Sequence, residues 1–281
     1  MYFLRLLSAL LVLNLTACSM VTQKHQEPGL NLDQQYQKAE ATFNFGENQD
    51  LEASVYWYGR AAKGGHEYAQ FSLGVFYVTS NFPDYEKALY WFGKAAQQGH
   101  LEAQSNLGVM YAYGFGVEAD DIEALKWFKS SAEGGFKNAQ YNVAYMYHYG
   151  QGVAKNINEA IKWYTKAARQ GLSMAQNDLA SIYSEGVEVG RDYQMAFTWY
   201  RSAAALNDRL AQFNLGLAYL NGQGVDVNLT LAVKYLRKSA LQGYSLAKTQ
   251  LVKLNVPVAK DMMDNVVVST QNWTEHHSRL L

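Results

Sequence analysis

Cysteine is almost absent from this sequence, in which Cys18 is the only one among 281 residues. A chain with a single cysteine forms no intramolecular disulfide, so its stability has to come from packing. Proline is also scarce, with three residues, and neither sign of charge dominates, since 24 Lys and Arg stand against 25 Asp and Glu. The balanced charge argues against a nucleic-acid partner and against a polybasic patch for membrane surfaces.

Long apolar runs are missing as well, apart from one near the N-terminus. Arg5 precedes an apolar run over residues 6–13, which is too short to span a bilayer but has the length of a signal-peptide core. We therefore expect residues 1–17 to be a signal peptide and residues 18–32 to be a flexible tether. The run ends in Leu-Thr-Ala-Cys at Cys18, which resembles the lipobox of bacterial lipoproteins.

This resemblance implies that Cys18 is lipidated and that the protein is anchored to a membrane of the bacterial cell envelope. Ser19 rather than Asp follows the cysteine, which implies an outer-membrane location facing the periplasm. The alternative is an ordinary cleavable signal peptide with an incidental cysteine.

What the sequence does contain is one pattern repeated along most of its length. The dipeptide Ala-Gln returns in steps of 34, 36, 36 and 36 residues, at Ala69, Ala103, Ala139, Ala175 and Ala211. Tryptophans keep the same steps, at Trp57, Trp91, Trp127, Trp163 and Trp199. A fixed period of this length indicates one supersecondary unit stacked on copies of itself.

One copy of the pattern predicts a helical hairpin. Residues 136–149 place apolar side chains on one face of a helix, and the Gly-Gln-Gly-Val segment at 150–153 interrupts it. Residues 156–169 then form a second amphipathic pattern, which ends at Gly171. Small residues recur in both helices, and we expect them to let the two backbones approach closely. We interpret the Trp column and a Tyr column (Tyr77, Tyr111, Tyr147, Tyr183 and Tyr219) as core.

The repeated motifs resemble those of Sel1-like repeats, which are relatives of tetratricopeptide repeats. The motifs are Ala-Gln-x-x-Leu-Gly-x-x-Tyr at 211–219, Gly-x-Gly-Val at 222–225 and Ala-x-x-Trp-Tyr-x-x-Ala-Ala at 160–168. The resemblance implies an all-α fold, a right-handed α-solenoid of stacked helical hairpins, which we place at residues 33–254. Residues 255–281 are then a C-terminal cap or tail, either a capping helix or, around residues 266–268, a strand.

The same analogy implies that the first helix of each hairpin lines a concave face that binds a protein partner. The candidate residues on that face are Phe71, Val75, Tyr141, Tyr145, His148, Tyr149, Phe213 and Leu217. For Phe71, Phe213 and Leu217, packing between neighbouring hairpins is an equally good interpretation. For Tyr141, Tyr145 and His148 we favour an aromatic binding groove, because tyrosines give large contact area at low entropic cost.

The sequence offers no catalytic or metal-binding pattern. His66 and His100 share one repeat position with Phe136 and Leu172, which suggests residues at helix starts and not metal ligands. The Gly-Phe-Gly of residues 114–116 follows a helix and so indicates a turn, not a nucleotide-binding loop. We therefore expect no metal, no cofactor, no catalytic residue and no small-molecule substrate.

The expected function is that of a non-enzymatic scaffold or adaptor that binds a component of an envelope assembly. A narrower hypothesis comes from lipoproteins similar to this chain, some of which are immunity proteins that neutralise periplasmic toxins such as secreted phospholipases. A third possibility is hydrolysis of β-lactams or cell-wall material, which is linked to a cysteine-rich branch of the family. That branch carries a regular pair of cysteines in each repeat, and this chain carries none.

Overall fold

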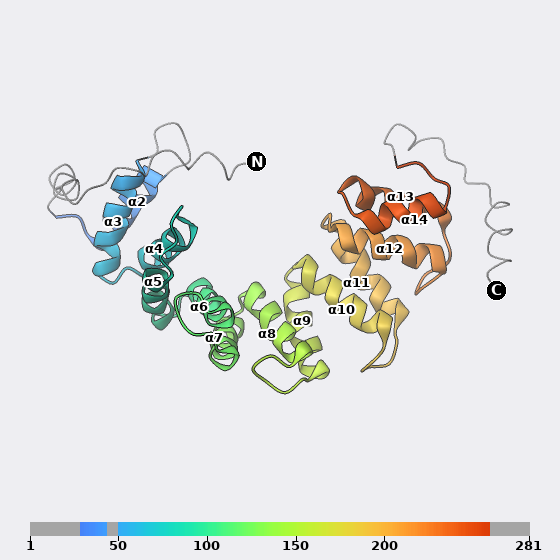
Figure 1. Ribbon diagram of the computed structural model, residues 1–281, viewed down its shortest axis with the longest axis horizontal. Coiled ribbons are helices and arrows are strands. Elements are labelled where there is room, and N and C mark those ends of the chain that lie inside the picture. The colour runs from blue at the N-terminus through green and yellow to red at the C-terminus, as the bar shows by residue number, and fades with distance from the viewer. Residues whose placement is uncertain (1–28, 44–49, 259–281) are drawn as a thin grey trace. The chain divides into compact units, whose positions relative to one another are not determined.

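The computed structural model describes residues 29–43 and 50–258, which contain helices and no strands (Figure 1). The signal peptide, Cys18, most of the tether and all but the first four residues of the expected cap at 255–281 lie outside these residues. The described helices fall into two compact units that divide between Lys155 and Asn156. The first unit contains α2 (Leu32–Phe43), α3 (Leu51–Lys63), α4 (Glu67–Thr79), α5 (Tyr85–Gln97), α6 (Leu101–Tyr113), α7 (Asp121–Glu133) and α8 (Lys137–Tyr149). The second contains α9 (Ile157–Arg169), α10 (Ser173–Glu185), α11 (Tyr193–Ala205), α12 (Arg209–Asn221), α13 (Leu229–Leu241) and α14 (Ser245–Lys253).

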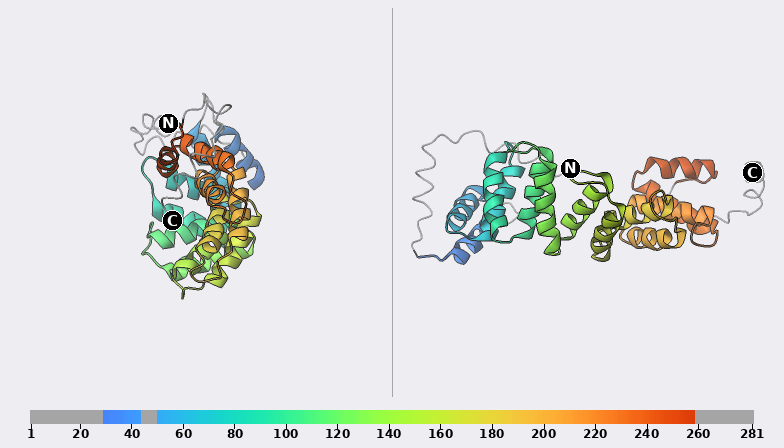
Figure 2. Two further views of the ribbon diagram at one scale, coloured as in Figure 1. Left: turned by 90° about the vertical axis from the view of Figure 1, so that its right-hand side faces the viewer. Right: turned by 90° about the horizontal axis from the view of Figure 1, so that it is seen from below.

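Consecutive helices pack as hairpins within each unit, which confirms the predicted all-α solenoid class (Figures 1 and 2). In the first unit the hairpins are α2–α3, α4–α5 and α6–α7, and the second helix of each packs on the first helix of the next. In the second unit α10–α11 and α12–α13 form hairpins, with α9 and α14 packed on either side of them. Residues that follow α14 lie against α13, because Arg237 Nε donates to the carbonyl of Pro257 at 3.0 Å.

Caps explain why the helices begin and end where they do. The second helix of every hairpin starts after an Asp or Asn whose side chain accepts a backbone N–H of the first turn: Asp50, Asp84, Asp120, Asn156, Asp192 and Asn228. The first helices α6, α8, α10 and α12 end at a glycine in the left-handed conformation, as in Gly114 with φ of 70°. Helix α4 lacks this glycine and ends at Ser80 in an extended conformation.

Close approach of the two helices in a hairpin depends on small residues in the first helix. A Cβ placed on Gly74 would lie 2.4 Å from the Phe92 ring, and one on Gly108 would lie 2.6 Å from the Phe128 ring. Glycine in a helix costs about 1 kcal/mol relative to alanine, and here the space it leaves is filled by a buried side chain. The expected mechanical role of the small-residue column is therefore confirmed in these two hairpins.

The Trp column is less central to the core than the sequence suggested. Trp57 is fully buried, whereas the other four tryptophans are only half-buried, and Lys166 Nζ lies 3.8 Å from the ring centroid of Trp163. The fully or nearly buried column is the next residue in each repeat: Tyr58, Phe92, Phe128, Tyr164, Tyr200 and Leu236. The predicted Tyr column is also half-buried throughout. Most of these side chains pack against the buried clusters from their edge, so the columns border the core, and the side chain that fills the space beside the small residue is the one after the tryptophan.

The glutamine of each Ala-Gln dipeptide joins one hairpin to the next. Its side-chain Nε2 donates to a carbonyl near the end of the preceding helix, with donor–acceptor distances from 2.9 to 3.5 Å. The five pairs are Gln70 with Ala62, Gln104 with Ala96, Gln140 with Ala132, Gln176 with Ala168 and Gln212 with Ala204. All five glutamines are buried, and the carbonyls they satisfy are among those that a helix leaves without an internal partner.

Gln176→Ala should therefore lower the free energy of unfolding by about 0.5–1.5 kcal/mol, because the carbonyl of Ala168 loses one of its two donors and keeps only the backbone N–H of Gly171. The matched control is Gln194→Ala, which removes an exposed glutamine from α11 in the same unit and should change stability by less than about 0.5 kcal/mol. Urea unfolding followed by circular dichroism measures both. Equal stability of the two variants would contradict a structural role for the buried glutamine.

Candidate interaction surface

Phe71 and Val75 on α4 belong to the apolar contact between neighbouring hairpins. The Phe71 ring stacks on the imidazole of His100, which precedes α6, with a centroid separation of 4.4 Å and an interplanar angle of 19°. It also lies 5.8 Å from the ring of Phe92, and Val75 packs against the same buried cluster. This arrangement favours the packing interpretation, and a direct partner contact by these two residues stays a prediction.

Phe213 and Leu217 on α12 have the corresponding position in the second unit. Both pack against a buried cluster that includes Leu236 and Leu251, and the Phe213 ring lies 5.1 Å from that of Tyr244 at the start of α14. They too support the contact between hairpins. Their role in partner binding is likewise a prediction that the packing alone does not establish.

The aromatic residues of α8 form a row that reaches the surface of the first unit. The Tyr141 and Tyr145 ring centroids are 6.4 Å apart, and those of Tyr145 and Tyr149 are 4.4 Å apart. The imidazole of His148 stacks on Tyr149 at 4.5 Å. Tyr145 and Tyr149 are 37% and 58% exposed, so this row presents aromatic surface to solvent. The structure thus brings together four of the eight predicted partner-binding residues, and we call them the α8 tyrosine row.

The two histidines of the repeat column are helix N-caps. The Nδ1 atoms of His66 and His100 accept the backbone N–H groups of Ala69 and Ala103, at 3.2 and 3.3 Å. An imidazole that accepts through Nδ1 is neutral and carries its proton on Nε2. Burial lowers the pKa of His100, although the carboxylates of Glu102 and Glu67 act in the opposite direction. The prediction that both histidines mark helix starts is confirmed.

Two buried tyrosines show the same electrostatic effect of burial. In the first unit, burial and a hydrogen bond donated by its hydroxyl to Glu40 at 2.5 Å raise the pKa of Tyr58 far above its ordinary value. In the second unit, burial raises the pKa of Tyr200, whose hydroxyl lies 3.1 Å from that of Ser181. Burial thus favours the neutral form of both phenols.

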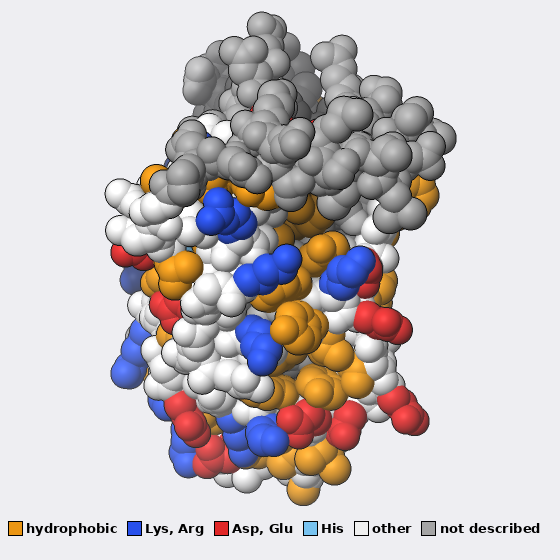
Figure 3. Space-filling view, turned by 90° about the vertical axis from the view of Figure 1, so that its left-hand side faces the viewer, with side chains coloured by type: hydrophobic (Ala, Val, Ile, Leu, Met, Phe, Trp, Pro, Cys, Tyr) orange, Lys and Arg blue, Asp and Glu red, His pale blue; other side chains and the backbone are white. Residues whose placement is uncertain are grey.

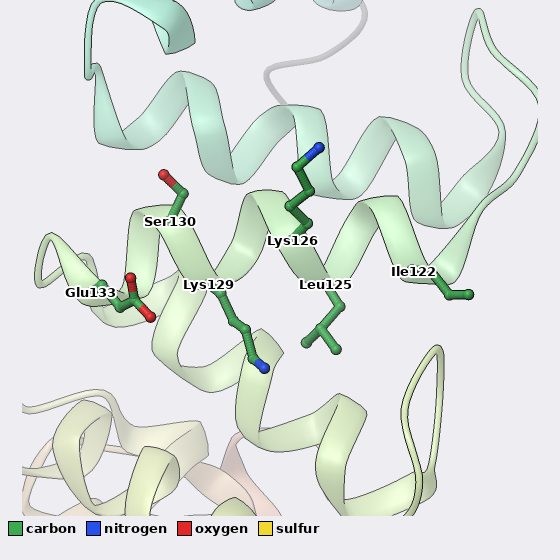
Figure 4. A pocket seen from close by; sticks show the side chains of 6 residues that line it. All are labelled: Ile122, Leu125, Lys126, Lys129, Ser130 and Glu133. Carbon is green, nitrogen blue, oxygen red and sulfur yellow. The ribbon is translucent and has the colours of Figure 1, made fainter.

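A shallow hollow of about 370 Å³ lies on the surface of α7, which the sequence did not indicate. It is lined by Ile122, Leu125, Lys126, Lys129, Ser130 and Glu133 (Figure 4). Figure 4 shows the two lysines pointing to opposite sides of the helix, so the polar groups do not converge on one point. This hollow has no arrangement of groups suited to catalysis.

Hydrophobic side chains are exposed at several other places. Figure 3 shows one face of the molecule, where they lie between Lys, Arg, Asp and Glu side chains. Among the described residues, no cluster of three or more His, Cys, Asp or Glu side chains could hold a metal ion. No helix in the described ranges is long and apolar enough to cross a membrane.

Stacked helical hairpins with a buried Gln at each junction define a helical repeat protein. The Sel1 repeat family model matches six segments, residues 43–66, 67–100, 101–136, 137–172, 173–208 and 209–244, and the chain belongs to this family. Repeats of this family generally mediate contacts with protein partners. No curated protein matches the sequence.

Two solved structures share the fold at 34% sequence identity. A protective antigen of uropathogenic Escherichia coli, described as displaying an SLR fold, superposes with a TM-score of 0.76 and is covered over 51% of its length by 85% of this chain. A Sel1 repeat protein from Oxalobacter formigenes gives a TM-score of 0.74, with 80% of this chain covering 66% of that one. The chain thus spans about half of the first relative and two thirds of the second. An immunity protein from Pseudomonas aeruginosa is 21% identical over 78% of this chain and 85% of its own, with a TM-score of 0.46.

The cap at His100 predicts a pH dependence of stability. The folded-state pKa lies below the ordinary value of 6.5, so the stabilising contribution is complete above pH 6.5 and is lost as the pH falls through the folded-state pKa. His100→Asn keeps a capping side chain that does not titrate. We expect the free energy of unfolding to fall more steeply below pH 6.5 in the wild type than in this variant. Parallel curves from urea titrations at a series of pH values would contradict the prediction.

Proposed function

We propose that this chain is a non-enzymatic, lipid-anchored protein of the bacterial envelope whose Sel1 repeats bind a protein partner through the α8 tyrosine row. The observation that carries the proposal is the exposure of Tyr145 and Tyr149 on a helix that is otherwise packed into the first unit. Tyrosine at an interface buries a large apolar ring while its hydroxyl keeps a hydrogen-bond partner, and it loses little side-chain entropy. The partner we propose is a component of an envelope assembly.

The matched test uses the anchored protein in its own cells, purified under gentle conditions. Tyr145→Ala should weaken binding of a co-purifying protein at least tenfold, because a tyrosine anchor contributes more than about 1.4 kcal/mol to binding. The free energy of unfolding should change by no more than roughly 1 kcal/mol. Tyr90→Ala is the control, since Tyr90 is 57% exposed on α5, a second helix. Equal loss of the co-purifying protein in both variants, or a lowered melting temperature in Tyr145→Ala, would refute the assignment.

The identity of the retained partner separates two roles. A structural or secretion component supports the scaffold role. A single toxin, such as a phospholipase held at nanomolar affinity, would instead support the immunity role.

The membrane anchor rests on the lipobox-like residues 15–18. Cys18→Ser should abolish incorporation of radiolabelled palmitate and release the protein from the membrane fraction, because the thiol is the atom that carries the lipid. Ser19→Asp should keep the label but move the protein to the inner membrane. Membrane association of Cys18→Ser at the wild-type level would contradict the anchor, and unchanged sorting of Ser19→Asp would contradict the outer-membrane location.

A further inference from the structure

Three aromatic rings stack at the hairpin turns of the first unit. Tyr85 is the first residue of α5, Tyr113 is the last residue of α6, and Phe115 lies in the turn between α6 and α7. The Phe115 ring is 4.9 Å from that of Tyr85 and 5.8 Å from that of Tyr113, with interplanar angles of 16° and 19°. Tyr113 is 71% exposed and Phe115 is 38% exposed. We call these three residues the aromatic corner.

The backbone holds this corner in place. Gly114 and Gly116 both have a φ of 70°, and a Cβ on Gly116 would lie 2.6 Å from the carbonyl group of Tyr85. The turn therefore sits directly on the start of α5, which a residue with a side chain would prevent. Backbone hydrogen bonds from Phe115 to Met110 and from Asp120 to Tyr111, both 2.9 Å, fix the turn to α6. The rings are thus pre-organised, and little entropy is lost when a ligand stacks on them.

The surroundings of the corner are acidic. Residues 113–125 include Glu118, Asp120, Asp121 and Glu123 and no Lys or Arg. Within the described residues, Glu118 and Asp121 form no ion pair, and both are exposed. A Cβ on Gly114 would lie 3.5 Å from the Cβ of Ala119, which places Glu118 at the same end of the hairpin as Tyr113. The nearest lysine in sequence to Tyr85 is Lys87, and it is paired with Asp84 at 2.8 Å.

The second unit shows which side chain stacks on an aromatic ring at the first position of a second helix. Tyr193 is the first residue of α11, as Tyr85 is of α5, and the guanidinium of Arg191 lies 5.5 Å from its ring centroid. The same guanidinium donates to the carbonyl of Glu185, the last residue of α10, at 3.1 Å. The chain itself therefore places an arginine over the ring that is equivalent to Tyr85. In the first unit the ring of Phe115 stacks on Tyr85 instead, and Tyr113, the next ring of the stack, is 71% exposed.

We propose that the aromatic corner binds an arginine side chain from a basic, extended segment of a partner protein. The guanidinium stacks on the exposed ring of Tyr113 while its N–H groups pair with the carboxylate of Glu118. Arginine suits both contacts, because its planar cation stacks on rings and presents several donors to carboxylates. Lysine offers a more strongly hydrated point charge and fits the stack less well.

The test measures binding of a fluorescein-labelled Gly-Ser peptide with four spaced arginines to the mature full-length protein, by anisotropy at about 0.15 M salt. Matched peptides carry lysine or the neutral isostere citrulline in place of arginine. We expect the arginine peptide to bind at least tenfold more tightly than the citrulline peptide and more tightly than the lysine peptide. Tyr113→Ala and Glu118→Gln should each weaken binding of the arginine peptide roughly three- to tenfold.

Two control variants separate a specific site from diffuse attraction to an acidic protein. Tyr90→Ala removes another exposed ring, and Glu52→Gln removes an exposed carboxylate from α3. Neither should change the affinity, and thermal melts should be unchanged in all four variants. Absence of binding, equal binding of the arginine and citrulline peptides, equal binding of the lysine peptide, or equal losses in the controls would each overturn the proposal. None of these outcomes depends on the α8 tyrosine row.

Discussion

The buried glutamine amide at each junction between hairpins is the interaction on which the rest of this structure depends. A single helical hairpin cannot bury its own apolar face, so every hairpin needs a defined position on its neighbour. The buried glutamine fixes that position by donating a second hydrogen bond to a carbonyl at the end of the preceding helix, which also accepts a backbone N–H of the turn. Because the amide must reach one particular carbonyl, it also sets how the next helix is placed. The exposed surfaces of α8 and of the hairpin turns follow from that placement.

The fold was largely predictable from the sequence because its determinants are local and repeat in register. The Asp and Asn caps, the glycines after the first helices and the small residues inside them each have a physical role that one repeat is enough to suggest. The central aromatic position was not predicted correctly. Trp163 attracts attention by its size, but Tyr164 is the residue that fills the space. A difference of one residue turns a helical side chain by about 100°, and a pattern read by residue type alone does not resolve it.

The candidate surfaces were predictable only in part, because exposure depends on what the neighbouring hairpin places opposite a residue. Val75 and Tyr145 occupy the same position of the repeat, yet Val75 packs against a buried cluster that includes Leu107 of the next hairpin, whereas Tyr145 is exposed. The aromatic corner was missed altogether. The sequence identified Gly114 and Gly116 as turn glycines, which they are, but the stack between Phe115 and Tyr85 joins two different hairpins. This stack can be recognised only from the way the two hairpins pack in three dimensions.

Partner binding through the α8 tyrosine row is the central functional claim, and in-cell photocrosslinking tests it most directly. A photoreactive amino acid is placed at position 145 of the anchored protein, expressed at its native level, and adducts are identified by mass spectrometry. Position 90 on α5 serves as the reference. Our account predicts one dominant protein adduct from position 145 that position 90 does not give. Adducts from position 90 and none from position 145 would show that the partner uses the second helices, and would contradict it.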